Sequence, residues 1–368
     1  MRIVEIIPKL FPCGGAETFL TTLSVSIKKQ FNDDIHVICL YEGNNDNFLA
    51  KELLDNGMTI HYLNKHTGID FKCAKSFRKL LKEIKPDVIH LHLEVLVTAI
   101  LGRIHTIAPV FSTFHNTADG GHYGKRNSLR NIVYRWYFRK RKVHCISISK
   151  LVDDSIKNFF KVKRTTIILN GVNIDNFPFN KDMINRKYTF IFVGRFVEAK
   201  NPLSIIKAFM LAQRAFPEAS LLMLGDGPLW KKCQKFVDDN GMKNVNLPGF
   251  SQNANKYIGD AQCLVLSSSY EGNPIVINEA IASGTYVISS NVGGVPELLN
   301  ETCGTMFEYD DINLLTNLSK KMKEFLTNKE AIFKKISENI EENRSRVSID
   351  DKARLYRNLF IEKGNIHE

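Results

Sequence analysis

The sequence lacks the features that mark membrane-spanning, secreted and zinc-binding proteins. No run of 18 apolar residues occurs, so we predict no segment that spans a bilayer. Residues 1–11 are typical of a first strand, because no apolar core followed by small residues is present as in a signal peptide. The 7 cysteines are odd in number and form no Cys-x-x-Cys pair. We therefore expect reduced thiols in a cytoplasmic protein and no zinc site.

The length and charge of the chain indicate two domains of different character. A chain of 368 residues is long enough for two domains, each with its own core. The formal net charge is +11, and the first 172 residues carry all of it, with 26 Lys and Arg against 15 Asp and Glu. The remaining residues contain 24 of each kind. This asymmetry indicates that the first half faces a polyanion or an anionic membrane surface.

Short apolar runs alternate with stretches of helical length in both halves. This alternation predicts an α/β fold with two Rossmann-like domains, each built on a parallel sheet, that face each other across a cleft. Residues 170–187 show little periodicity, so we place the connection between the domains there. The predicted strands are Ile3–Ile7, Ile35–Leu40, Thr59–Leu63, Val88–Leu91, Val110–Thr113, Val143–Ile148, Thr166–Leu169, Thr189–Val193, Leu221–Leu224, Asn244–Leu247, Cys263–Leu266, Tyr286–Ser289 and Thr305–Phe307.

The stretch from Ser267 to Leu299 carries the strongest functional signal. We predict a helix with Asn273 as its cap and Pro274 as its first residue, since proline fits the first helical position. The amide groups and positive dipole end of such a helix bind anions such as phosphate. Glu271 in the approach loop and Glu279 on the helix flank this anion site. A ligand with both phosphates and hydroxyls, such as a nucleotide sugar, fits it.

Two other strand-to-helix loops could contact the same kind of ligand. Gly14 and Gly15 follow the first predicted strand, where a glycine pair lets the backbone approach a phosphate, although a plain tight turn explains the pair equally well. Gly194 and Arg195 close the first strand of the second half, and Lys200 follows. Both cations could reach a diphosphate. The alternative is that they are solvated surface charges.

His115 follows the predicted strand Val110–Thr113 and could hydrogen-bond a sugar hydroxyl or transfer a proton. A lone histidine is more often structural, so its place at a strand end is the only support for a functional role. No Asp-x-Asp sequence occurs in the chain. We therefore predict no obligatory metal ion, with cationic side chains and helix amides balancing the phosphate charge.

The segment from Lys125 to Lys142 combines a high density of cations with aromatic residues. A basic amphipathic helix of this kind can lie at a membrane interface or contact the acceptor. Alternatively, its apolar residues pack on the sheet while the basic face is solvated. Nucleic acid is a third possibility, but no recognition motif accompanies the charge, and we predict no nucleic-acid partner. The residues of this predicted patch are Arg135, Trp136, Arg139, Lys140, Arg141 and Lys142.

Taken together, these motifs resemble the retaining GT-B glycosyltransferases of family 4 (glycosyl transferases group 1), particularly bacterial exopolysaccharide and capsule enzymes. The resemblance implies that Gly14 and Gly15 approach the donor phosphate and that Arg195 and Lys200 hold the diphosphate. It also implies that Glu271 and His115 contact the transferred sugar and that Glu279 binds the ribose hydroxyls. The residues expected to bind the donor are Gly14, Gly15, Gly194, Asn273, Pro274, Ile275 and Glu279, with His115, Arg195, Lys200 and Glu271 as the catalytic set.

The resemblance implies an acceptor-binding domain at 1–172, a donor-binding domain at 173–345 and a final helix at 346–368 that crosses back to the first domain. We expect transfer of a hexose or N-acetylhexosamine from a UDP-sugar to a lipid-linked saccharide, at the inner face of the cell membrane, without a cofactor. The alternatives are a nucleotide-sugar epimerase or phosphorylase with the same architecture, and a non-catalytic membrane-associated partner in polysaccharide assembly.

Overall fold

The computed structural model describes residues 1–12, 14–118, 129–140 and 143–364. The chain forms two compact units: unit 1 comprises Met1–Gly171 and Ile349–Glu368, and unit 2 comprises Val172–Ser348. The predicted boundaries were 172/173 and 345/346. Every predicted strand is present, with ends shifted by two residues at most. Among the described residues, no helix has the length and apolar character needed to cross a membrane.

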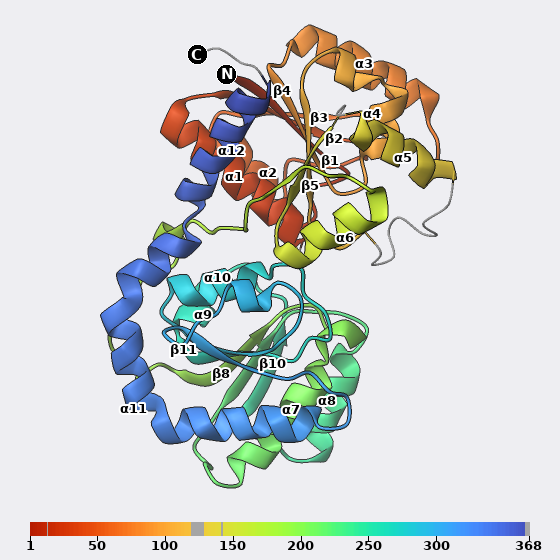
Figure 1. Cartoon of the computed structure of the whole chain (residues 1–368). Helices are drawn as coiled ribbons and strands as arrows, with labels where there is room; N and C mark the ends of the chain where they lie inside the picture. The colour runs from red at the N-terminus through yellow and green to blue at the C-terminus, as the bar shows by residue number, and fades with distance from the viewer. Residues whose placement is uncertain (13, 119–128, 141–142, 365–368) are drawn as a thin grey trace. The chain divides into compact units, whose positions relative to one another are not determined.

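Unit 1 contains a seven-stranded parallel sheet with the order β3-β2-β1-β4-β5-β6-β7 (Figure 1). Chain order reverses between β1 and its neighbour β4, as in a Rossmann-like sheet. The strands are β1 (Arg2–Ile7), β2 (Asp34–Cys39), β3 (Thr59–Tyr62), β4 (Val88–His92), β5 (Val110–Phe114), β6 (His144–Ser147) and β7 (Thr165–Ile167). The helices are α1 (Gly15–Phe31), α2 (Phe48–Asp55), α3 (Phe71–Ile84), α4 (Leu96–Leu101), η1 (Ile104–Thr106), α5 (Leu129–Arg139), α6 (Lys150–Phe160) and α12 (Ile349–Gly364).

The two faces of this sheet differ in chemistry. Alternate residues of a strand point to opposite faces, so Val4 and Ile6 of β1 join the apolar cluster beneath α3, α4, α5 and α6. Glu5 points to the other face, toward α1 and α12, and is fully buried there. The tilted rings of Phe19 on α1 and Tyr356 on α12 lie over this face, with centroids 5.8 Å apart. Unit 1 therefore has one mainly apolar layer and one layer that encloses the buried Glu5 carboxylate.

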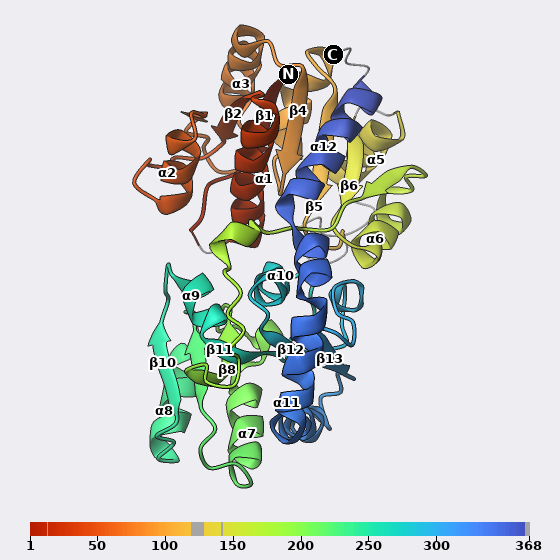
Figure 2. The same ribbon diagram turned by 90° about the vertical axis from the view of Figure 1, so that its left-hand side faces the viewer.

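The carboxyl-terminal helix α12 belongs to unit 1. It packs along α1 (Figure 2), and the Ser26 hydroxyl donates a hydrogen bond of 2.6 Å to Asp350 at its first turn. Arg357 forms an ion pair of 3.0 Å with the buried Asp33. These contacts attach the last helix to the amino-terminal sheet, far from it in sequence.

Unit 2 contains a six-stranded parallel sheet with the order β10-β9-β8-β11-β12-β13. Chain order reverses between β8 and β11. The predicted α/β fold class with two Rossmann-like domains is thus confirmed. The strands are β8 (Tyr188–Val193), β9 (Leu221–Leu224), β10 (Val245–Gly249), β11 (Ala261–Leu266), β12 (Tyr286–Ser290) and β13 (Gly304–Phe307). The helices are η2 (Ile174–Asn176), η3 (Glu198–Lys200), α7 (Pro202–Gln213), α8 (Trp230–Asp239), α9 (Ala254–Gly259), α10 (Ile275–Ala282), η4 (Val295–Glu297) and α11 (Leu314–Val347).

Two arginines fix the segment that was predicted to connect the two domains. Arg186 is buried and donates hydrogen bonds to the carbonyl oxygens of Ala261 and Ser283, at 3.0 and 2.8 Å. Arg344 of α11 donates to the carbonyls of Phe177 and Ile174, at 2.6 and 3.0 Å. Because carbonyl acceptors hold both guanidinium groups, residues after Gly171 form part of unit 2 and are not a free linker.

Candidate functional site

The predicted residues lie at the carboxyl ends of strands at each chain reversal, except His115, which follows β5, one strand beyond the reversal between β1 and β4. In unit 2, Gly194 and Arg195 follow β8, and Glu271 lies in the loop after β11, the neighbour of β8. In unit 1, Gly14 follows β1, and His115 comes directly after β5. Ligands of open parallel sheets bind at such reversal points, because the loops on the two sides diverge and leave a crevice. Each of these residues thus lies in the loop that its sequence position indicated, and its role in binding stays a prediction.

The main feature of the unit 2 site is an ion pair between Lys200 and Glu271. The Lys200 ammonium lies 2.5 Å from a Glu271 carboxylate oxygen, which also accepts a hydrogen bond of 2.7 Å from the Ser268 hydroxyl. The Glu271 side chain is 7% exposed and that of Lys200 is 25% exposed. Arg195 is exposed, and its guanidinium forms no hydrogen bond or ion pair with the residues described. The two predicted diphosphate-binding cations thus differ, since Glu271 already neutralises only Lys200.

Close backbone packing holds Glu271 in place. Gly293 has a φ of +60°, and a Cβ atom there would lie 1.6 Å from the carbonyl oxygen of Glu271. The Gly294 amide donates a hydrogen bond of 3.1 Å to the same oxygen. Gly225, with a φ of +133°, approaches the carbonyl oxygen of Gly194 in the same way. Glycine is required at these positions for both the left-handed backbone and the close approach.

The helix after Glu271 begins one residue later than predicted. Pro274 has an extended backbone, with φ −71° and ψ 115°, and is the cap; the first helical residue is Ile275. The prediction that Asn273 caps this helix is therefore wrong, since proline at the cap has no side-chain acceptor and α10 has no side-chain cap hydrogen bond. Asn273 is buried beside the helix start. The amino-terminal end of α10 still follows the loop that carries Glu271.

Glu279 lies on α10 and is half-buried. Burial raises the pKa of its carboxyl group to about 7. A carboxylate accepts hydrogen bonds from hydroxyls, while the protonated form is a poorer acceptor. The capacity of Glu279 to accept hydrogen bonds is therefore expected to change with pH near neutrality.

The glycine turn in unit 1 is less open than the sequence indicated. Gly14 caps α1, and its amide donates to the Phe11 carbonyl oxygen at 3.1 Å, so this amide is already used. A Cβ atom on Gly14 would lie 1.9 Å from the Glu17 carboxylate, which folds back over the turn. Gly15 is the first helical residue. Gly14 thus makes room for an acid, and an anion at this turn would meet that charge.

His115 has neighbours that the sequence analysis missed. It is half-buried, and its Nε2 lies 3.1 Å from Nδ1 of His92. His92 and His90 on β4 both contact one oxygen of Glu5, each at 2.8 Å. Burial and the nearby histidines lower the pKa of His115 well below its usual range. The sequence does carry a signal for this buried polar cluster, because His-x-His in one strand and Glu in the neighbouring strand interrupt otherwise apolar sequences.

Glu5, His90 and His92 also have ligand atoms close enough for a metal ion. These atoms lie within 4.8 Å of one another, and the three side chains are fully buried. Two imidazoles and a carboxylate are suitable ligands for zinc. The same atoms are at hydrogen-bond distances from one another, so hydrogen bonds between the imidazoles and the carboxylate explain the cluster equally well.

The predicted basic patch is only partly within the described residues. On α5, Tyr134, Tyr137 and Phe138 are buried against the sheet. The other face is exposed, with Trp136 at 53% and Arg139 beside it. Arg135 is half-buried, Lys140 follows the helix end and is exposed, and Arg141 and Lys142 lie outside the described residues. One face of α5 thus packs on the sheet, while the other presents Trp136 and cations to solvent, and the membrane role of this face stays a prediction.

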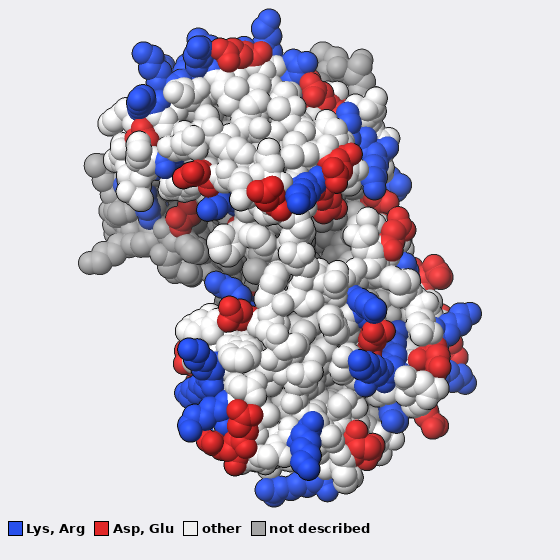
Figure 3. Space-filling model, turned by 180° about the vertical axis from the view of Figure 1, so that it is seen from behind, with Lys and Arg blue, Asp and Glu red and all other residues white. Residues whose placement is uncertain are grey.

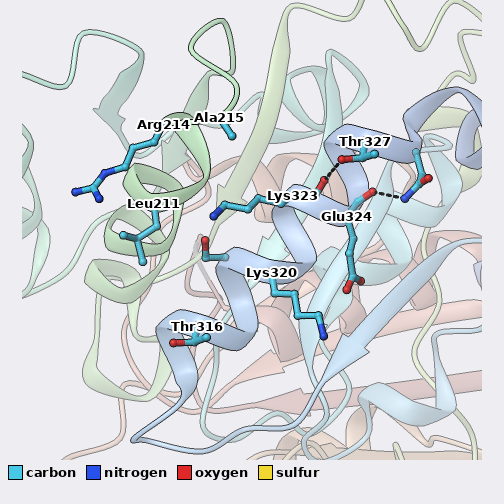
Figure 4. A pocket seen from close by; sticks show the side chains of 10 residues that line it. Leu211, Arg214, Ala215, Thr316, Lys320, Lys323, Glu324 and Thr327 are labelled. Atoms are coloured by element: carbon cyan, nitrogen blue, oxygen red, sulfur yellow. Dashed lines mark hydrogen bonds between the residues drawn. The ribbon is translucent and has the colours of Figure 1, made fainter.

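Other charged surfaces carry both signs. On the face drawn in Figure 3, Lys and Arg side chains are interspersed with Asp and Glu. A pocket of about 710 Å³ lies between α7 and α11 of unit 2 (Figure 4). Arg214, Lys320 and Lys323 line it together with Glu324. It contains none of the predicted site residues.

Comparison with known proteins assigns the class. Two Rossmann-like domains, each with a parallel sheet, are the architecture of the GT-B fold, and the structure of Anabaena HepE in complex with UDP superposes with a TM-score of 0.80. That alignment covers 98% of this chain and 100% of HepE at 15% sequence identity, so it shows the fold alone.

The sequence places the chain in a family. Residues 13–176 match Glycosyltransferase Family 4, and residues 173–346 match Glycosyl transferases group 1. The chain therefore belongs to the family 4 (group 1) glycosyltransferases and is a glycosyltransferase. An Escherichia coli UDP-Gal:alpha-D-GlcNAc-diphosphoundecaprenol alpha-1,3-galactosyltransferase is 28% identical over 340 residues, 85% of each chain. The Staphylococcus aureus capsular polysaccharide biosynthesis glycosyltransferase CapH is 28% identical over 291 residues, 76% of this chain and 78% of CapH.

Proposed function

We propose that this glycosyltransferase moves a hexose or N-acetylhexosamine from a UDP-sugar to a lipid-linked saccharide during synthesis of a cell-surface polysaccharide. The observation that carries the donor assignment is the grouping of Arg195, Lys200 and Glu271 at the reversal between β8 and β11. Two cations suit a diphosphate, and a buried carboxylate suits sugar hydroxyls. The Escherichia coli relative is named for a UDP-sugar donor and a diphosphoundecaprenol-linked acceptor, which supports the same substrate classes here.

The expected chemistry is positioning combined with charge stabilisation. An acceptor hydroxyl oxygen bonds to the anomeric carbon while the bond from that carbon to the diphosphate breaks, and the electron pair leaves with the diphosphate. Arg195 and Lys200 would stabilise this departing charge. The family resemblance supports retention of the anomeric configuration. The two cations and the α10 amides support transfer without an obligatory metal ion or other cofactor.

We also propose a peripheral position on an anionic membrane, at the inner face of the cell membrane. The support is the exposed face of α5, where Trp136 lies beside Arg139 and Lys140. Tryptophan and cations on one helix face suit the interface between lipid headgroups and water. The charge-neutral variant of Arg139, Lys140, Arg141 and Lys142 should bind vesicles containing anionic lipid more weakly than the wild type does. Equal binding of both proteins would refute this part of the proposal.

The main experiment is a transfer assay with the purified chain. A panel of UDP- and GDP-sugars would be combined with undecaprenyl-diphosphate-linked saccharides, with the product linkage and anomeric configuration read by NMR. We expect one UDP-sugar to be transferred with retention, in the presence of EDTA as well as in its absence. Arg195→Ala should lose at least about 100-fold in turnover, as expected when a group that stabilises departing charge is removed. Arg214→Ala, an exposed arginine elsewhere in unit 2, is the matched control.

The same assay separates the alternatives. Donor incubated alone would yield an epimerised sugar if the protein were an epimerase, and a glycan incubated with inorganic phosphate would yield a sugar phosphate if it were a phosphorylase. Absence of nucleotide-sugar binding by calorimetry would favour a non-catalytic role. A near-native rate for Arg195→Ala, or complete dependence on a divalent metal, would contradict the proposed chemistry.

A further inference from the structure

A chain of polar contacts runs through the buried interior of unit 1 and ends at His115. Glu5, His90 and His92 are all 0% exposed. One Glu5 oxygen lies 2.8 Å from His90 Nδ1 and 2.8 Å from His92 Nε2. Nδ1 of His92 then lies 3.1 Å from Nε2 of His115. These contacts cross from β1 to β4 to the end of β5, beneath α1 and α12.

The positions of the protons in this chain follow from the acceptors. An ionised carboxylate only accepts hydrogen bonds, so both imidazole nitrogens that contact Glu5 must carry protons. The nearby histidines outweigh the effect of burial and hold the pKa of Glu5 at about 2, which keeps it ionised. Burial lowers the pKa of His92 to about 4, so this ring is neutral and carries a single N–H. That proton is on Nε2, which leaves Nδ1 of His92 as an acceptor.

The contact with His92 also fixes the proton position of His115. Because Nδ1 of His92 is an acceptor, Nε2 of His115 must be the donor in the 3.1 Å contact. His115 is neutral at physiological pH, since burial lowers its pKa, and its Nδ1 therefore carries no proton. At the other end of this series of polar contacts, His90 Nε2 lies 2.7 Å from the Thr113 hydroxyl. The Thr113 hydroxyl lies 3.2 Å from the Tyr356 hydroxyl of α12. The direction of these last two bonds does not alter the result at His115.

We propose that Glu5 and His92 are positioning residues that fix His115 as the tautomer protonated at Nε2, with Nδ1 presented as an acceptor for a hydroxyl of the transferred sugar. This inference rests on the proposed function and on the contact between His115 and the transferred sugar that the family resemblance implies. Orientation of one imidazole nitrogen by the hydrogen bond of the other is a general way of setting the role of a histidine. The chain also gives Tyr356 a contact route from the carboxyl-terminal helix to the same residue.

A metal ion on Glu5, His90 and His92 would give the opposite result. The metal would take Nε2 of His92, and the His92 proton would move to Nδ1. Nε2 of His115 would then have to accept, and Nδ1 of His115 would carry the proton. The tautomer of His115 therefore distinguishes the proton chain from a metal site.

The first test is long-range 1H–15N NMR of the full chain labelled at histidine, with His115→Gln used to assign the signal of His115. We expect Nε2 protonated and Nδ1 bare, together with no stoichiometric metal by elemental analysis. A proton on Nδ1, or one equivalent of bound zinc, would overturn the proposal. This measurement needs no substrate, so it stands even if the proposed transfer reaction is not found.

The second test compares two variants of His92 in the transfer assay. The side-chain amide of His92→Asn lies where Nδ1 was and can still accept from His115, whereas that of His92→Gln lies where Nε2 was and faces Glu5. We expect His92→Gln to lower kcat by about 10- to 100-fold with little change in the donor KM, the size of effect seen when partners that orient functional histidines are lost. His92→Asn should recover most of this loss. Equal loss in both variants, with His115 in the same tautomer as in the wild type, would reduce His92 to a packing role and refute the proposal.

Discussion

The ion pair between Lys200 and Glu271 leads to a prediction in which affinity and turnover change in opposite directions. If Lys200 binds the donor diphosphate, it must loosen its 2.5 Å contact with Glu271 when the nucleotide arrives. Glu271→Gln keeps the shape of the side chain and its acceptor for Ser268 while removing the charge that holds Lys200. We therefore expect the variant to bind UDP more tightly and to transfer sugar more slowly.

The magnitude follows from the exposure of the two partners. Lys200 is 25% exposed, so the pair is screened by solvent and resembles a surface ion pair more than a fully buried one. Such a pair is worth about 1 kcal/mol, which corresponds to about a fivefold lower Kd for UDP when the competing carboxylate is removed. Transfer should fall by about 10- to 100-fold, because a charged hydrogen-bond acceptor for the sugar is lost.

Calorimetry with UDP and the transfer assay measure the two effects separately. Glu198→Gln is the matched control, because Glu198 is exposed, lies two residues before Lys200 and forms no ion pair within the described residues. The control should leave both UDP affinity and turnover close to wild type. Unchanged or weaker UDP binding by Glu271→Gln would refute the reasoning, and equal tightening in both variants would show a general effect of net charge.

Two further predictions concern single buried groups. The pKa of Glu279 is raised to about 7, so the fraction of its ionised form, which accepts hydrogen bonds, increases with pH. The affinity for the sugar donor, measured by calorimetry, should therefore rise about tenfold from pH 6 to pH 8 in the wild type and stay constant in Glu279→Gln. A constant affinity in the wild type would contradict a role of Glu279 in ribose binding. The raised pKa has the opposite effect on the stability of the fold. As pH rises above 4.5, the free energy of unfolding decreases, because Glu279 ionises more readily in the unfolded chain than in the fold. Arg186→Met should lower the free energy of unfolding in urea by about 3 kcal/mol, since it leaves buried carbonyls without their charged donor, whereas the exposed Arg214→Met should change it by less than about 0.5 kcal/mol. Equal effects of the two arginine variants would contradict the anchoring role of Arg186.

Each candidate site residue at a strand end was predictable from local pattern. Apolar runs of strand length, separated by helical stretches, determine parallel strands, and the loops that follow β1, β5, β8 and β11 can be identified by counting along the chain. Position at a strand end was enough to select His115, Arg195 and Glu271. The helix after Glu271 was also predictable, but its first residue was not. Whether Pro274 lies inside or before the first turn depends on its ψ angle of 115°, and proline fixes only φ.

Sequence by itself determined which residue types lie at the reversal points of the two sheets, because strand order is strongly constrained by the α/β alternation. Tertiary structure alone decided which of them touch. Lys200 meets Glu271 across 71 residues, and His92 meets Glu5 across 87, through strands that are neighbours in space only. A histidine at a strand end looks the same in sequence whether it faces solvent or a buried carboxylate. The hydrogen-bonding partner of a histidine determines which ring nitrogen carries the proton. Side-chain packing across β1, β4 and β5 determines which partner the histidine has.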